Sequence, residues 1–155
     1  METTKDFAGL IRKAGKAQRT GSFLNPDIKG FHVEIAYASK FVLNQIREVA
    51  REIHGNARSG QKEERLNEEK LRNEYARQII RDWKGLTPEK LKEILPGVEF
   101  GKDVANTQIP FSHDVAVALL EASLEFEAWV IDIATEVKNF KHVAVRQEEL
   151  QDNLK

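Results

Sequence analysis

The stretch that decides the fold of this chain is residues 109–140, IPFSHDVAVALLEASLEFEAWVIDIATEVKNF. Ser112 is expected to cap a helix whose first turn carries Asp114, and Ser123 interrupts the apolar run before a longer helix begins. The expected buried residues are Val115, Ala118, Leu119 and Ala122 in the first helix, and Phe126, Trp129, Val130, Ile133, Ala134, Val137 and Phe140 in the second. The second set recurs with the period of a helix that buries one face. This stretch therefore predicts a packed helical core.

Three further helices are expected upstream, each beginning after a residue suited to cap it: Ser39, Asn67 and Thr87. The expected apolar stripes are Val42, Ile46, Val49, Ala50 and Ile53, then Leu71, Tyr75, Ile79 and Trp83, then Leu91, Ile94 and Leu95. We expect the first of these helices to end at Gly55-Asn56 and the second at Gly85, which suits the left-handed position after a helix.

One segment has the pattern of a strand. FHVEIAYA (31–38) alternates apolar and polar residues, as a half-buried strand does. GSFLNPDIKG (21–30) is rich in turn formers and is expected to be a loop, and NARSGQKEER (56–65) an exposed turn or loop. VEFGKDVANTQIPF (98–111) is expected to be extended or irregular, and a second strand or a hairpin could come from it. The predicted fold is mainly α with a small β element (α+β): five or six helices packed on a short two- or three-stranded antiparallel sheet or hairpin.

The chain of 155 residues has the size of one domain. We expect a basic amphipathic N-terminal segment over 1–22, a single globular helical domain over 23–140, and a charged tail or frayed helix over 141–155. The hydrophobic share of 41%, the charged share of 32% and the net charge of −1 are those of an ordinary soluble globular protein. No apolar window approaches the length of a membrane span, so we expect no membrane association and a cytoplasmic location.

The residue types that usually form catalytic or metal sites do not have the spacing in this sequence that such sites require. There is no cysteine, and His32, His54, His113 and His142 are scattered without the spacing of zinc ligands. The segment GVEFGK (97–102) looks like a phosphate loop but has the wrong glycine spacing and continues with Asp103. We therefore expect no catalytic residues, no cofactor and no metal.

Nucleic-acid binding has more support in the sequence than a catalytic or metal site. The charged helix predicted over 68–83 carries four cations, and the loop before it adds Arg58, Lys62 and Arg65. Six acidic residues along the same helix and loop interleave with these cations and cancel the field that phosphate binding requires. We therefore expect no nucleic-acid partner, although a small helical DNA-binding regulator stays open as a function class.

The order of these features resembles the tail assembly chaperones of long-tailed bacteriophages. The likeness rests on the strand FHVEIAYAS, the step DWKGLT (82–87), the corner IPFS (109–112) and the terminal helix FEAWVIDIATEVKNF (126–140). It covers about two-thirds of the chain and includes no catalytic motif.

The resemblance implies a small, mostly helical protein without enzymatic activity that forms homo-oligomers in the host cytoplasm. Chaperones of this family are thought to coat the tape measure protein and keep it soluble while the tail tube protein polymerises around it, and to be absent from the mature virion. The alternative is a structural head–tail connector or tail completion protein of a phage or prophage, which would stay in the particle.

Candidate interaction residues come from the N-terminal segment. Phe7, Leu10 and Ile11 fall on one face of the amphipathic helix predicted there. A helix of this kind must bury its apolar stripe on its own core or against another molecule, so these three residues are the candidates for self-association or partner binding.

Overall fold

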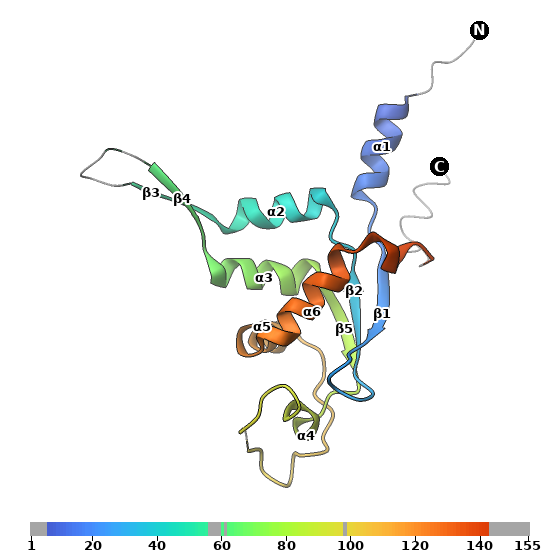
Figure 1. The fold of residues 1–155 in the computed structure, drawn as a ribbon, viewed down its shortest axis with the longest axis vertical. Coiled ribbons are helices and arrows are strands. Elements are labelled where there is room, and N and C mark those ends of the chain that lie inside the picture. Colours follow the sequence, from blue (N-terminus) through green and yellow to red (C-terminus); the bar gives the residue numbers. More distant parts are fainter. Residues whose placement is uncertain (1–5, 56–59, 61, 98, 143–155) are drawn as a thin grey trace.

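The computed structural model describes residues 6–55, 60, 62–97 and 99–142, and in this part of the chain the fold is α+β, as predicted (Figure 1). The α-helices are α1 (Phe7–Lys16), α2 (Lys40–Ala50), α3 (Glu68–Gln78), α4 (Pro88–Leu91), α5 (His113–Ala122) and α6 (Leu124–Thr135), and a 3₁₀ helix, η1, spans Val137–Phe140. The strands are β1 (Thr20–Leu24), β2 (His32–Ala36), β3 (Arg51–Gly55), β4 (Lys62–Leu66) and β5 (Ile80–Lys84). The first residues of the predicted N-terminal segment and residues 143–155 of the predicted tail lie outside the described residues.

The predicted helix starts are confirmed. The side chains of Ser39, Asn67, Thr87, Ser112 and Ser123 each accept a hydrogen bond from the backbone N–H three residues further on. Local sequence sets these positions because a short polar side chain satisfies a donor that the first helical turn leaves open.

The main sheet is antiparallel with strand order β1-β2-β5. Val33 of the predicted strand is paired with Phe23 on one side and Trp83 on the other, and both Val33 and Ile35 are fully buried. The prediction of a loop over 21–30 was wrong in its first half, because Gly21 to Leu24 pair along β2. The partners of β2 are thus β1 and β5, and residues 99–111, which the structure describes, contain no strand.

The predicted helix over 68–83 was wrong in its last turn. α3 ends at Gln78, and the chain turns directly into β5. The neighbouring residues Ile79 and Ile80 are both buried, and the carbonyl of Ile79 accepts a hydrogen bond from the N–H of Ala36 at 2.8 Å. The apolar residues from Leu71 to Trp83 recur with a helical period, but from Ile80 onward the backbone forms hydrogen bonds with β2 instead of continuing the helix.

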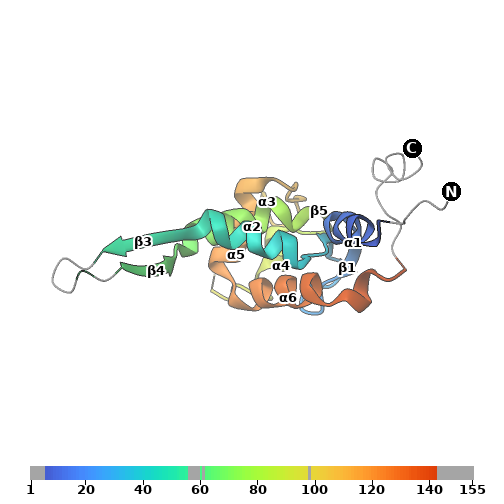
Figure 2. The ribbon, with the colours of Figure 1, turned by 90° about the horizontal axis from the view of Figure 1, so that it is seen from above.

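The helix predicted to reach Gly55 ends at Ala50, and the exposed turn predicted over 56–65 includes part of a strand. β3 and β4 pair from Arg51 with Leu66 to Gly55 with Lys62. This hairpin continues the antiparallel pair α2–α3 and projects from the body (Figures 1 and 2). Ile53 is 63% exposed on it, so its place in the apolar stripe of α2 was also wrong.

The core lies between the three-stranded sheet and helices α3, α5 and α6. The ring of Phe31 stacks on that of Phe126 at 6.1 Å between centroids, and Trp83 packs edge-on against Phe31 and Phe111. The predicted α6 stripe is largely buried, whereas Val137 is 49% exposed.

The predicted buried side of α5 was partly wrong. Ala116, Leu119 and Leu120 are buried, whereas Ala118 and Ala122 are exposed. The reason is that α5 packs against both α3 and α6. The buried side of α5 therefore faces both helices and differs from the side that a single neighbour would bury.

Gly85 adopts the predicted left-handed backbone, with φ +84, but it follows β5 and not a helix. A side chain at this position would overlap the carbonyl oxygen of Gly30. The two glycines thus allow the turn before β2 and the turn after β5 to pass close to each other.

Within the described residues, no helix combines the length and the apolar character that crossing a bilayer requires.

Candidate functional site

The three candidate interaction residues lie on α1 and are all open to solvent. Phe7 is 63% exposed, Leu10 59% and Ile11 71%, and none of the ten residues of α1, all of which the structure describes, is buried. Asp6 caps the helix by accepting a hydrogen bond from the N–H of Gly9 at 2.9 Å. We call the surface formed by Phe7, Leu10 and Ile11 the outer face of α1.

The outer face is held away from the body of the molecule. Figure 1 shows α1 projecting beyond the sheet, next to the beginning of α2. Only a short segment, Ala17 to Arg19, separates α1 from β1. An apolar helix face displayed in this way is typical of a surface that binds another molecule.

The opposite side of α1 forms a groove with α2. This basic groove has a volume of about 390 Å³. Its lining residues are Arg12, Ala14, Gly15, Lys16, Tyr37, Ser39, Lys40 and Phe41. The ammonium group of Lys16 lies 5.3 Å from the ring centre of Phe41, which ties α1 to α2. Among the residues that the structure describes, three cations and no acidic residue line the groove, together with the aromatic residues Tyr37 and Phe41.

A second hollow of about 560 Å³ adjoins the basic groove at Tyr37 and follows α2. Val42, Gln45 and Val49 line it from α2, and Arg77 and Gln78 line it from the end of α3. Sequence reasoning did not identify either hollow. The signal for the first was the pair Tyr37 and Phe41, two aromatic residues on either side of the Ser39 cap and outside the main helical stripe.

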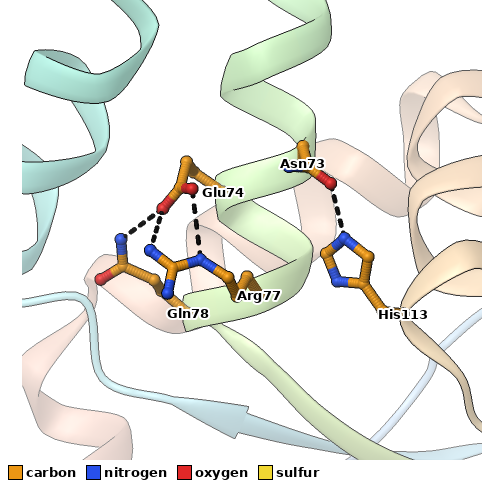
Figure 3. A network of polar contacts seen from close by, with 5 residues as sticks. All are labelled: Asn73, Glu74, Arg77, Gln78 and His113. Atoms are coloured by element: carbon orange, nitrogen blue, oxygen red, sulfur yellow. Dashed lines mark hydrogen bonds and ion pairs between the residues drawn. The ribbon is translucent and has the colours of Figure 1, made fainter.

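A buried carboxylate on α3 is the centre of a polar network (Figure 3). Glu74 is 6% exposed and accepts hydrogen bonds from Arg77 Nη2 at 2.7 Å, from Arg77 Nε at 3.2 Å and from Gln78 Nε2 at 2.7 Å. These bonds, Arg77 first, hold the pKa of Glu74 below its ordinary value, although burial of the carboxylate acts in the opposite direction. The pKa of Arg77 is raised in turn by the same hydrogen bond.

Other polar contacts fix α3 to the helices beside it. Nε2 of His113, in the first turn of α5, lies 2.5 Å from Oδ1 of Asn73, and Nε of Arg72 lies 3.2 Å from Glu127 of α6. These two pairs attach α3 to α5 and α6, so they have a structural role. Among the described residues no group of three His, Asp or Glu side chains is placed to hold a metal ion.

The comparison with protein families matches residues 37–153 to the model of the YdaY prophage protein. The chain belongs to the YdaY prophage protein family. The matched range includes every element from α2 to η1, so it contains the α2 side of the basic groove and the core helices α5 and α6. The searches of curated proteins and of solved structures found no match.

Membership of the YdaY prophage protein family confirms the coarser part of the resemblance, a phage or prophage protein. The family description names neither tail assembly nor a partner. Helix α1 lies before the matched range, so the family match does not bear on its outer face.

Proposed function

We propose that this prophage protein is a non-enzymatic tail assembly chaperone that binds the tape measure protein in the host cytoplasm. The observation that carries the proposal is the outer face of α1, which displays three large apolar side chains on a helix that projects from the folded body. A chaperone of this kind needs such an apolar surface and no reactive group.

The physical fit is that of one helix against another. A tape measure protein is expected to be a long helical chain, and an amphipathic helix can place its apolar face against Phe7, Leu10 and Ile11. One such contact is small and weak on its own. Many copies along one partner gain affinity through avidity and keep the apolar stripe of that partner away from water until the tail tube protein replaces them.

Co-expression with the candidate tape measure protein tests this function. We expect the partner to move from the pellet to the supernatant and to co-elute with many copies of this protein. The informative variant is Leu10→Asp with Ile11→Asp, which should lose the effect because two carboxylates would have to be desolvated at the contact. Val104→Asp is the matched control, since Val104 is an exposed apolar residue (44%) on a different part of the surface. A partner that stays in the pellet with the unchanged protein contradicts the proposal.

A head–tail connector or tail completion protein is the second candidate function. The observation that favours it is the pair of projections, α1 and the β3–β4 hairpin, which extend from the body in different directions as in subunits that interlock in a ring (Figure 1). Such a protein stays in purified particles, whereas a chaperone does not. Detection of the protein in purified particles, together with failure of the co-expression test, favours the connector.

A further inference from the structure

The region from α5 to the end of α6 has a one-sided charge. Residues 113–137 contain six acidic residues and no lysine or arginine. One of the six, Glu127, is paired with Arg72 of α3 inside the molecule. Another, Glu136, follows the last residue of α6 and accepts a hydrogen bond from the N–H of Lys138 at 3.4 Å.

Two of these acids share one side of α6 with small and apolar residues. Leu124, Ala128 and Asp132 recur every four residues along the helix, and Glu125 lies beside them. All four are exposed, Leu124 at 80%. We call these four residues the acidic face of α6.

The basic groove between α1 and α2 has the complementary properties. Arg12, Lys16 and Lys40 line it together with the aromatic residues Tyr37 and Phe41. Lys40 stands in the first turn of α2, where the helix dipole already makes the potential positive, and that turn contains no acidic residue. In contrast, the first turns of α3, α4, α5 and α6 each carry at least one acid. An acidic occupant would therefore relieve a repulsion that exists in the single chain.

The groove and the beginning of the acidic face are on different parts of one molecule. Figures 1 and 2 show the beginning of α6 beside α5 and well away from α1, whereas the end of α6 lies nearer, where the N–H of Ala38 donates to the carbonyl of Ala134 at 2.8 Å. α1 is tied to β1 by the short segment Ala17 to Arg19, which prevents it from moving across to the beginning of α6. The acidic face as a whole can therefore enter the groove only from a second copy.

We propose that the basic groove of one copy binds the acidic face of α6 of the next copy, so that this protein associates head to tail. The contact joins two different surfaces, so it produces a ring if the rotation closes and an open chain if it does not. The attraction comes from exposed charges, so each step is weak and depends on salt. The inference does not rest on the chaperone function, because it concerns the protein alone.

Matched charge reversals test the contact, with the mass in solution measured by sedimentation velocity. The groove variant is Arg12→Glu with Lys40→Glu, and the α6 variant is Glu125→Lys with Asp132→Lys. We expect the unchanged protein to associate in about 0.01 M salt and to dissociate in about 1 M salt, where the Debye length falls from about 30 Å to about 3 Å. Each variant alone should associate at least roughly tenfold more weakly, because like charges then face each other.

Mixing decides between a specific contact and a general charge effect. The two variants together should assemble again, because each supplies the charge that the other now lacks. Lys29→Glu with Lys102→Glu changes the net charge as much as the groove variant does but at exposed sites elsewhere, and it should leave association unchanged. The melting temperature of each variant checks that the fold is intact.

Two results overturn the proposal. One is a monomer for the unchanged protein at low salt and high concentration, which leaves the groove to a different acidic partner. The other is a mixture of two folded variants that fails to assemble. Neither result bears on solubilisation of the tape measure protein, so the failures of the two proposals can be told apart.

Discussion

Glu74 shows at the scale of single residues how one side chain fixes the end of a helix. Its carboxylate is almost completely buried, while the side chain of Arg77 that binds it is 60% exposed. Water therefore screens the charge attraction in part, and the hydrogen bonds to Arg77 and Gln78 contribute most of what this residue adds to stability.

The pKa of Glu74 is lowered in the folded state, so stability must depend on pH. The contribution of Glu74 is fully present above the pKa of an unfolded glutamate, about 4.3, and is lost as the pH falls through the lower pKa of the folded state. We expect Glu74→Gln to lower the free energy of unfolding by about 1 kcal/mol at pH 7 and by less at pH 3.

Urea unfolding at the two pH values measures this difference. The control is Glu63→Gln, because the pair of Glu63 and Arg65 is exposed on both sides and should contribute almost nothing. Equal losses for Glu74→Gln at pH 7 and pH 3 would show that the carboxylate is not ionised in this network.

Ser123 acts at the scale of secondary-structure elements, because one residue both ends α5 and begins α6. Its N–H donates to the carbonyl of Leu119 at 3.0 Å, and its Oγ accepts from the N–H of Phe126 at 3.1 Å. The residue is 3% exposed, so water cannot replace either bond. The angle between the two helices, and with it the position of the acidic face of α6, depends on this corner.

We expect Ser123→Ala to lower the free energy of unfolding by about 1–2 kcal/mol, because the buried N–H of Phe126 then has no acceptor. Thermal or denaturant unfolding measures the change. Ser112→Ala is the matched control, since Ser112 caps α5 in the same way but is exposed. Its cost should be smaller, because water can bind the freed N–H of Val115. A smaller loss at Ser123 than at Ser112 contradicts this account.

At the scale of the whole molecule, α1 separates two surfaces of different character. The outer face is apolar, and the side toward α2 contributes Arg12 and Lys16 to the basic groove. The residues of the outer face do not line the groove. Binding of a partner and association of copies should therefore respond to different substitutions.

We expect Leu10→Asp with Ile11→Asp to leave the free energy of unfolding within about 0.5 kcal/mol of its original value, since both side chains are exposed. The mass of the homo-oligomer at low salt should also stay unchanged, while binding of the tape measure protein is lost. Denaturant unfolding and sedimentation velocity on the same samples provide the measurements. A loss of oligomer mass with an intact fold would place self-association on the outer face.

Local sequence was sufficient wherever the physical cause is itself local. The caps at Ser39, Asn67, Thr87, Ser112 and Ser123, the alternating strand β2 and the apolar stripe of α6 all follow from neighbours within one or two helical turns. The same reasoning placed Phe7, Leu10 and Ile11 on one helix face, and the structure shows that face exposed.

Tertiary structure decided what depends on a partner far away in the sequence. Gly21 to Leu24 and Ile80 to Lys84 are strands because β2 lies between them and supplies their hydrogen bonds, although their own residues favoured a loop and a helix. The buried side of α5 and the basic groove likewise exist only because elements distant in the chain are packed together. The sequence by itself determined the α+β class, the helix starts and the amphipathic N-terminal helix. Only the packing of the chain decided which faces are left open to another molecule, because exposure is a property of all neighbours at once.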